Sequence, residues 1–510
     1  MSPETNPFIE TFYEYTALVI FWLIVIASIK LLFMFIHDKF QSTHAIRRNY
    51  PIIGRFRYFF EHMGEFFRQY FFAADREEMP FNRAQRSWVY RAAKNIADTI
   101  AFGSTLDTTK DGNVIFSNHP YPVLEEDGRS ASEVLIGESS RTPWRTNAIF
   151  GISGMSFGAI SKPAIRALSK GAKISGTWLN TGEGGLSKHH LEGGCDLIFQ
   201  IGTAKYGVSD SDGNLCDDSL LKIASFESVK AFEIKLSQGA KAGKGGILPA
   251  DKVTQEIAEA RAIPVGEASI SPNRHKDIAC DEDLLEMVSR IRRVTGKPCG
   301  FKMVLGEPDS LINLAKLIKK RGLDEAPDFI TLDSADGGTG AAPMTLMDDV
   351  GLTIKESLPM LIATLQRYKL KDRIKVFVSG KMINPKDVAW ALCTGADFVC
   401  TARGYMLSLG CIQSLQCNKN TCPTGIATHN QKLQRGLVVK DKAQRVANYT
   451  VNMVSAVEEL SHCCGVIEPR LLEERHARVC ESGHSIPLKT YNENVVEQQK
   501  GLISLFSLGD

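Results

Sequence analysis

The sequence predicts an α/β protein: a (β/α)8 TIM barrel that follows an N-terminal transmembrane helix and an irregular, partly helical connecting region. Three observations predict it. Short apolar runs alternate with amphipathic helical segments from residue 148 onward, as in a parallel barrel. Glycine-rich turns follow these runs, and a long apolar segment lies near the N-terminus. We place the transmembrane segment at 1–37, the connecting region at 38–147, the barrel at 148–480 and a C-terminal tail at 481–510.

The N-terminal segment Thr16–Ile36 is interrupted by one charge, Lys30. It is long enough to span a bilayer, and no basic region precedes it as in a cleaved signal peptide. A buried core helix is the alternative, but apolar residues occupy every face of this helix. Acidic residues precede the segment and basic residues follow it: Glu4, Glu10 and Glu14, then Lys39, Arg47, Arg48, Arg55 and Arg57. This asymmetry predicts a single-pass protein of the inner (cytoplasmic) membrane with its catalytic domain in the cytoplasm.

The connecting region begins with aromatic and basic residues mixed together. Tyr58–Phe60, Phe66–Phe67 and Tyr70–Phe72 alternate with arginines. Such a segment beside a membrane span can lie among lipid headgroups, or its aromatic face can pack on the enzyme domain, and the sequence leaves both open. Residues 80–94 have helical character. The rest, rich in Gly, Asn, Pro and Asp, predicts irregular structure around the barrel.

The barrel itself is predicted from eight runs that alternate with helices. The predicted strands are Ala148–Ile152, Thr177–Asn180, Leu197–Ile201, Lys230–Leu236, Gly300–Leu305, Phe329–Leu332, Ile374–Val378 and Asp397–Thr401. The predicted helices are Pro163–Ala172, Asp283–Val294, Leu311–Arg321, Lys355–Tyr368, Pro385–Cys393 and a closing helix at Lys442–Leu460. Gly239–Ile278 is too long for a plain loop and predicts an excursion at the active site. Beyond Ser482 the polar composition gives no clear structural prediction.

Composition narrows the function classes. The 510 residues can bury a large core and suggest two or more units. The net charge of +2, without a basic stripe, argues against nucleic-acid binding. The 12 cysteines form no evenly spaced disulfide framework, which predicts a reducing compartment.

Three cysteines between Gly395 and Asn430 predict an inorganic centre. Cys411, Cys417 and Cys422 have the spacing C-x5-C-x4-C in a turn-rich polar segment. Three thiolates without an obvious fourth suit a [3Fe-4S] cluster better than a zinc site, which takes four ligands. Ordinary free cysteines are the alternative, but core cysteines usually stand singly in apolar runs.

This segment carries a family resemblance. GCIQSLQCNKNTCPTGIATHN resembles the cluster loop of glutamate synthase. Four further motifs resemble successive parts of the FMN-binding domain of that enzyme, in the same order: MSFGAIS, NTGEGG, QGAKAGKGGILPADKV and DGGTGAAP. The resemblance covers about Ala148–Gly465. It implies a (β/α)8 barrel that binds FMN and a [3Fe-4S] cluster, and an oxidoreductase acting on the CH–NH2 group of donors.

The resemblance also implies a site at the carboxyl ends of the strands. Glu183, Gln238, Lys241 and Lys302 are the implied catalytic residues, and Lys252 matches a position near the 2-oxoglutarate pocket. Two departures stand out: Ser379-Gly380-Lys381 replaces the usual Asp-Gly-Gly, and Lys244 replaces an acid. The implied FMN-binding residues are Met155, Ser156, Asn180, Thr181, Gln238, Lys302, Gly337, Gly338, Ser379, Gly380, Lys381, Ala402, Arg403 and Gly404.

The partners follow from what the sequence does not match. No segment matches the glutamine amidotransferase domain of the large glutamate synthases, and no G-x-G-x-x-G motif lies in a strand–turn–helix setting. We therefore expect electrons from an external donor, such as ferredoxin or a reductase subunit, and ammonia from solution or from a separate partner.

Three functions are compatible with these residues. The first is a membrane-tethered enzyme that aminates 2-oxoglutarate to glutamate. The second is an amino-acid or N-alkyl amino-acid dehydrogenase that passes electrons to a membrane acceptor. The third is a non-catalytic redox sensor, which the intact motifs at the strand ends disfavour.

Overall fold

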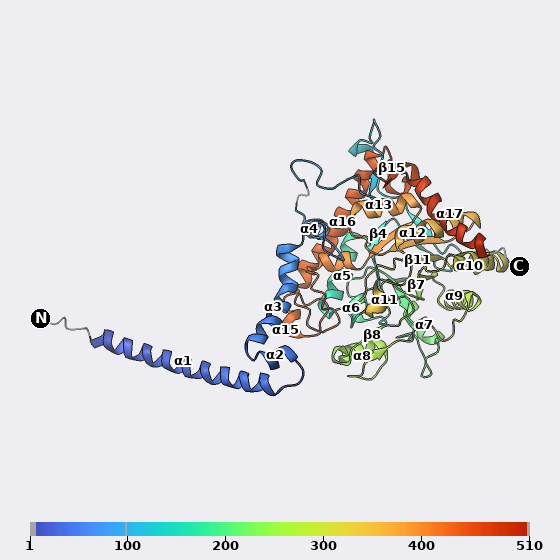
Figure 1. The fold of residues 1–510 in the computed structure, drawn as a ribbon. Helices are drawn as coiled ribbons and strands as arrows, with labels where there is room; N and C mark the ends of the chain where they lie inside the picture. The colour runs from blue at the N-terminus through green and yellow to red at the C-terminus, as the bar shows by residue number, and fades with distance from the viewer. Residues whose placement is uncertain (1–6, 97–98, 507–510) are drawn as a thin grey trace. The chain divides into compact units, whose positions relative to one another are not determined.

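The computed structural model describes residues 7–96 and 99–506 (Figure 1). The chain forms two compact units, Met1–Ala84 and Gln85–Asp510. The boundary predicted at residue 147 does not coincide with a division between units, because residues 85–147 belong with the barrel.

The first unit is helical. It contains α1 (Pro7–Phe40), α2 (Ala45–Asn49), α3 (Ile53–Phe67) and a π-helix, η1 (Arg68–Phe72). Within α1, residues Thr11–Phe40 are long and apolar enough to cross a membrane by length and composition. The helix therefore extends beyond the predicted span at both ends.

The second unit contains a closed barrel of eight parallel strands, which confirms the predicted fold. Its strands are β4 (Phe150–Ile152), β5 (Trp178–Asn180), β6 (Asp196–Ile201), β7 (Val229–Lys235), β10 (Cys299–Val304), β11 (Phe329–Asp333), β12 (Lys375–Ser379) and β13 (Phe398–Thr401). Each coincides with a predicted run to within two residues. β13 pairs with β4, which closes the barrel.

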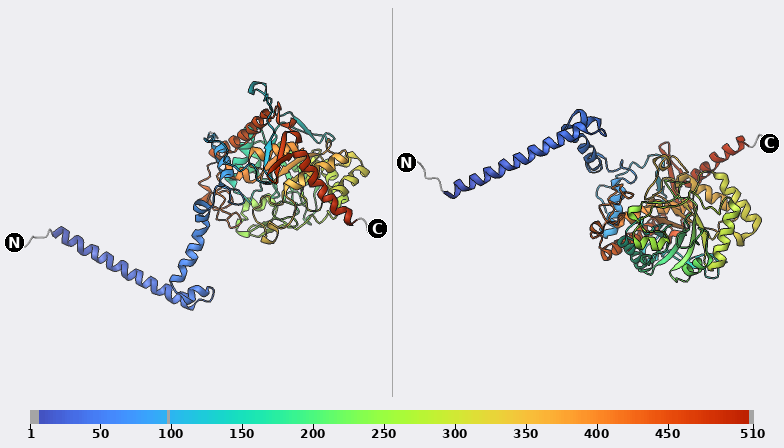
Figure 2. Two further views of the ribbon diagram at one scale, coloured as in Figure 1. Left: turned by 45° about the horizontal axis from the view of Figure 1, so that its top comes forward. Right: turned by 90° about the horizontal axis from the view of Figure 1, so that it is seen from below.

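Helices follow the strands and surround the barrel (Figure 2). They are α5 (Lys162–Ser175), α6 (Lys188–Leu191), α7 (Asp217–Ala224), α9 (Asp281–Thr295), α10 (Pro308–Arg321), α12 (Ile354–Arg367), α13 (Pro385–Thr394) and α16 (Val439–Cys463). Residue types that are common at helix ends cap several of these helices. For example, α5 ends at Gly176, whose φ of 69° suits a residue without a side chain.

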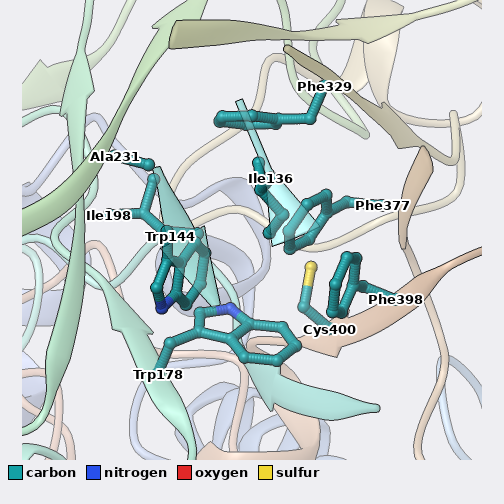
Figure 3. Close-up of a cluster of buried hydrophobic side chains, with 9 residues drawn as sticks. All are labelled: Ile136, Trp144, Trp178, Ile198, Ala231, Phe329, Phe377, Phe398 and Cys400. Carbon is teal, nitrogen blue, oxygen red and sulfur yellow. The ribbon is translucent and has the colours of Figure 1, made fainter. Parts of the chain in front are cut away.

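A hairpin closes the amino end of the barrel. Its strands, β2 (Val134–Ile136) and β3 (Trp144–Thr146), pair antiparallel. Ile136 and Trp144 enter a buried cluster with Trp178, Phe329 and other residues that begin the barrel strands (Figure 3). Part of the connecting region thus completes the barrel core. The same region contains the helix α4 (Arg83–Lys94).

The excursion from Gly239 to Ile278 has a structure of its own. It contains β8 (Ile247–Leu248), the 3-10 helix η3 (Ala250–Lys252), α8 (Gln255–Arg261) and β9 (Ser269–Ile270), and β8 pairs with β9. Two short helices, α11 (Met344–Met347) and α14 (Arg403–Ser408), follow β11 and β13, and α15 (Gln431–Gln434) precedes α16.

The described residues near the C-terminus form a small sheet and a helix. β1 (Val114–Phe116), β14 (Ala477–Glu481) and β15 (His484–Pro487) form a three-stranded sheet. α17 (Leu488–Phe506) follows and packs against α12. The region beyond Ser482, for which the sequence makes no clear structural prediction, therefore contains the strand β15 and the helix α17.

Candidate functional site

The barrel interior has two layers, because side chains alternate along each strand. Trp178 on β5 and Phe329 on β11 belong to the apolar layer at the amino end. Two residues further along these strands, Asn180 and Thr331 line a small cavity. Polar side chains occupy this second layer. The alternation of side chains along the strands therefore separates an apolar end of the barrel, which stabilises the fold, from a polar end, which can bind ligands. The other residues around the cavity are Ile152, Ser153, Trp178, Ile198, Glu233, Lys302, Phe377 and Cys400.

Glu233 is the centre of the polar layer. Its side chain is buried and accepts hydrogen bonds from Asn180 Nδ2 (2.8 Å), Gln200 Nε2 (2.6 Å) and Thr331 Oγ1. Three donors compensate the carboxylate for lost hydration. They also connect side chains of three different strands, β5, β6 and β11, through one carboxylate.

Lys302 stands beside this network. Its Nζ lies 3.0 Å from Asp333 Oδ2 and 3.4 Å from Ser153 Oγ, which in turn lies 3.3 Å from Ser379 Oγ. Burial lowers the pKa of Lys302, but the attraction of Asp333 and Glu233 outweighs burial and raises it above its ordinary value. The lysine is therefore a permanent cation in the barrel mouth. The ion pair with Asp333 holds the ammonium in place.

Two cations lie on the loops that follow the seventh and eighth barrel strands. Lys381 Nζ is 2.9 Å from Asp336 Oδ2, and Arg403 Nη2 donates to Asp336 O at 3.0 Å. Gly380 has a φ of 113°, and a Cβ there would lie 2.3 Å from Ser334 Cβ. A tight glycine turn, two cations and the short helix α14 are the components of a barrel phosphate site.

A second charged group surrounds Glu183. Its Oε1 lies 2.9 Å from Lys235 Nζ. Burial raises the pKa of Glu183, but Lys235 and Lys241 outweigh burial and lower it. Glu183 is packed closely, since a Cβ on Gly202 would lie 2.6 Å from Glu183 Cβ. The group is thus an ionised, enclosed carboxylate between two lysines.

More cations than carboxylates surround this position. Lys241 is buried, and burial lowers its pKa to about 8 despite the attraction of Glu183. Arg261 is also buried; its Nη1 donates to Ser269 Oγ at 2.9 Å. Buried cations in excess of their counter-ions favour an anionic ligand.

The loop that carries Cys411, Cys417 and Cys422, called the cluster loop below, has an unusual backbone. Gln413, Leu415 and Asn420 all have φ between 54° and 58°, a region that residues with side chains rarely adopt. Gln413 N donates to Cys411 Sγ at 3.4 Å. Turns of this kind present backbone N–H groups to anions and to iron–sulfur sites. Observed strain of this sort marks a functional segment.

Burial makes two of the three cysteines of this loop poor nucleophiles. All three are free thiols. Burial raises the pKa of Cys411 to about 12 and raises that of Cys417, whereas a reactive cysteine needs a lowered pKa. In the described residues, no three His, Cys, Asp or Glu side chains converge on one metal ion.

Two direct hydrogen bonds and a bridge through Lys252 join the cluster loop to the loop that follows β4. Lys252 Nζ donates to Ala159 O (3.2 Å) and Cys417 O (3.1 Å), His429 Nε2 contacts Gly158 O (2.8 Å), and Ser161 N donates to Ile426 O (2.7 Å). From α4, Tyr90 Oη donates to Cys411 O at 2.6 Å. Lys252, which the sequence associated with the substrate pocket, has these two carbonyl partners instead.

The remaining predicted residues lie at the same end of the barrel. Gln238 Nε2 donates to Thr339 Oγ1 at 2.7 Å, so it adjoins the loop after β11 rather than Glu183. Met155 and Thr181 are buried on the loops after β4 and β5, with Ser156 beside Gly182. A Cβ on Gly338 would lie 2.9 Å from Arg403 Cδ. Gly337 N donates to Ser334 O (2.8 Å), Ala402 O accepts from Met406 N (3.0 Å), and Gly404 N donates to Thr401 Oγ1 (3.3 Å).

Three charged residues near these groups were not predicted from the sequence. Glu233, Lys235 and Asp333 are charged residues at inward positions of apolar strands. The alternation of side chains along a strand could have identified them. Glu233 and Lys235 lie on one face of β7, and Asp333 is two residues beyond Thr331 on β11. A charge that alternates with buried apolar residues predicts a group inside the barrel.

Comparisons with known proteins agree with the family resemblance. A family model described as the conserved region in glutamate synthase matches residues 109–466. The glutamate synthase large subunit-like protein YerD of Bacillus subtilis (strain 168) is 37% identical over 501 residues, which cover 90% of this chain and 95% of that protein. The archaeal-type glutamate synthase (NADPH) of Thermotoga maritima is 35% identical over 316 residues, 62% of this chain and 59% of that protein.

The chain therefore matches about three-fifths of the Thermotoga protein and nearly all of the Bacillus protein. Among solved structures, a mutant flavocytochrome b2 with bound pyruvate has a TM-score of 0.44 at 16% identity, over 77% of this chain and 82% of that one.

Proposed function

Because the chain belongs to the glutamate synthase family, we propose that it is an FMN and iron–sulfur oxidoreductase that forms glutamate from 2-oxoglutarate and ammonia. The observation that carries the proposal is the enclosed group of Glu183, Lys235 and Lys241 at the barrel mouth. This group combines cations for an acidic substrate with a carboxylate for an amine.

FMN would be held across the barrel mouth. Its phosphate suits the turn at Gly380–Lys381 and the start of α14 at Arg403, and its ring suits the loop that includes Met155 and Ser156. Lys302 supplies the positive charge that favours a reduced, anionic ring. When bound, FMN supplies hydride transfer at the amino-acid carbon. Ser379 offers a hydroxyl that already contacts Ser153 Oγ.

The substrate would bind between the two charged groups. Lys235, Lys241 and Arg261 can neutralise the carboxylates of a dicarboxylic keto acid. Glu183 is ionised and enclosed, so it can accept a proton from ammonium or hold an amine in place. Enclosure also excludes water, which strengthens each of these charge interactions.

The cysteines Cys411, Cys417 and Cys422 would hold a [3Fe-4S] cluster, which supplies one-electron exchange with an external donor. The hydrogen bonds from Lys252 and His429 keep the cluster loop against the loop that would contact FMN. A ferredoxin or a reductase subunit is the expected donor. Ammonia would come from solution or from a partner protein.

We also propose that α1 anchors the chain in the inner membrane, with the barrel in the cytoplasm. Its length, its composition and the basic residues after it support this. The anchor favours one alternative function, in which an amino acid or N-alkyl amino acid is oxidised and electrons pass to an acceptor in the bilayer.

Assays in both directions test the proposal. The detergent-solubilised full chain, given 2-oxoglutarate, ammonium and a reduced low-potential donor, is expected to form glutamate. Reduction of the flavin by glutamate or its N-alkyl derivatives, with transfer to a quinone analogue and no glutamate synthesis, would establish the alternative. Activity in neither direction, with flavin and iron bound, would leave the sensor function.

The variant Glu183→Gln tests the role of the carboxylate. We expect turnover to fall by about 10²- to 10⁴-fold, with flavin and iron contents unchanged. Glu259→Gln, which alters an exposed carboxylate on α8, is the matched control and is expected to retain full activity. Equal turnover of the two variants would exclude a proton-transfer or amine-binding role for Glu183.

A further inference from the structure

The helices that follow α1 carry an exposed apolar stripe. Ile53, Phe56, Phe60, Phe67 and Phe71 recur every three to seven residues along α3 and η1, and their exposed fractions range from 39% to 74%. Phe56 stacks on Phe60, and the rings of Phe67 and Phe71 lie 5.3 Å apart. These contacts place the side chains on one face, as in an amphipathic helix. A stripe of this size is too large to be incidental exposure.

The start of α3 is fixed beside the end of α1. Arg55 binds both oxygens of Asp38 at 2.7 Å, and Ile52 N donates to Asp38 Oδ2 at 3.0 Å. Asp38 is fully buried by this arrangement. A bidentate ion pair with an additional backbone donor gives a defined geometry. The end of α1 and the start of α3 therefore lie side by side (Figure 1).

The charges around the stripe suit phospholipid headgroups. Lys39, Arg48 and Arg57 are exposed around the turn between α1 and α3. Clusters of basic residues beside a span attract the anionic lipids of the cytoplasmic leaflet. Phenylalanine rings insert below the headgroups while arginines remain at their level. Apolar area, basic flanks and a fixed position next to the span all indicate one occupant.

We propose that α3 and η1 lie in the headgroup–acyl boundary of the membrane that α1 crosses, with the stripe of Ile53, Phe56, Phe60, Phe67 and Phe71 turned into the lipid. This inference rests on the proposed membrane anchor. It makes the N-terminal unit a two-part attachment, one helix across the bilayer and one along its surface, and it decides between the two alternatives that the sequence left open for this segment.

Photo-crosslinking in the full chain tests the inference. p-Benzoylphenylalanine in place of Phe60 reports what covers the stripe. The same residue in place of His62, about 200° round the helix, is the matched control. In membranes reconstituted with phosphatidylglycerol and phosphatidylethanolamine, the probe at 60 is expected to form phospholipid adducts at least several-fold more often than the probe at 62.

Each other result overturns the inference. Adducts between position 60 and barrel peptides would show that the stripe packs on the enzyme domain. Adducts between two chains would show that it is a dimer interface, and equal lipid labelling at both positions would show no preferred orientation. Failure of the anchor is recognised separately, because the full chain would then leave the membrane in high salt before any irradiation.

Discussion

If Lys241 binds the substrate as proposed, its protonation links substrate binding to pH, because burial lowers its pKa from 10.5 to about 8. As the pH rises through 8, the substrate anion loses one of its cationic partners. We therefore expect the KM for 2-oxoglutarate to be lowest below pH 8 and to rise above it. In Lys241→Arg the guanidinium stays charged, so the rise is expected to move to higher pH. Steady-state kinetics from pH 6.5 to 9.5 measure it.

The contribution of Lys241 to the free energy of unfolding is expected to rise with pH, whereas the affinity for the substrate is expected to fall. Between about pH 8 and 10.5 the unfolded chain binds more protons at Lys241 than the folded chain does. The contribution of this group to stability therefore increases with pH across that window. Lys241→Met removes the dependence, and denaturant unfolding at several pH values would reveal it. A KM independent of pH in the wild type would contradict the assignment of Lys241 to the substrate.

Lys252 is a second side chain whose role follows from its contacts. Its ammonium is buried and bonds the carbonyls of Ala159 and Cys417. Lys252→Met is expected to cost about 1.5–3 kcal/mol, as for hydrogen bonds made by charged groups, and to lower the iron content of the anaerobically purified chain.

Lys419→Met provides the comparison for Lys252, because Lys419 is an exposed lysine on the loop that carries Cys417. It is expected to keep full stability and iron content. Thermal unfolding and iron analysis of the two variants measure the difference. Equal iron contents would show that the tie between the loops is unnecessary for the cluster.

At the scale of single elements, the β2–β3 hairpin acts as a closure of the barrel. Trp144 is buried, contacts Trp178 edge to face, and donates from Nε1 to Asp196 Oδ2 at 2.9 Å. Trp144→Ala leaves a cavity and is expected to destabilise the barrel by about 3–5 kcal/mol.

The neighbouring residue provides the control for Trp144. Arg145 is exposed and pairs with Glu133 at the surface, so Arg145→Ala is expected to cost about 1 kcal/mol or less. Denaturant unfolding followed by circular dichroism measures both. A similar small loss in the two variants would mean that the hairpin covers the barrel without contributing to its core.

The loop that carries Cys411, Cys417 and Cys422 is an element with a defined backbone shape. Three left-handed residues, the hydrogen bond from Gln413 N to Cys411 Sγ and the contact from Tyr90 hold it in place. The wild-type chain is expected to purify yellow-brown, and Cys417→Ala is expected to lose the cluster signal in electron paramagnetic resonance while retaining FMN. A flavin-only spectrum of anaerobically prepared wild type would contradict the cluster assignment.

At the scale of the whole molecule, the testable property is orientation in the membrane. The charge asymmetry around Thr16–Ile36 predicts that the barrel faces the cytoplasm. A reporter fused after Asp510 is expected to be active only if it is of a type that works in the cytoplasm. The barrel should also resist protease in right-side-out vesicles. Digestion there, with vesicles intact, would reverse the topology.

The sequence by itself determined the barrel, its strands and most of its helices. These depend on periodicity among near neighbours, and every predicted strand appears within two residues of its place. It also determined the family, because the motifs lie in contiguous stretches such as Met155–Ser161 and Asp336–Pro343. The cysteine spacing likewise pointed to one loop with an unusual backbone.

Only the tertiary structure decided which charges meet. The pairs Lys302–Asp333 and Lys235–Glu183, and the contact of Lys252 with Cys417, join residues from different strands and loops. The closed register of the barrel places them together, and local sequence does not encode register between distant strands. For the same reason the hairpin in the barrel core and the helix α17 became clear only in the structure.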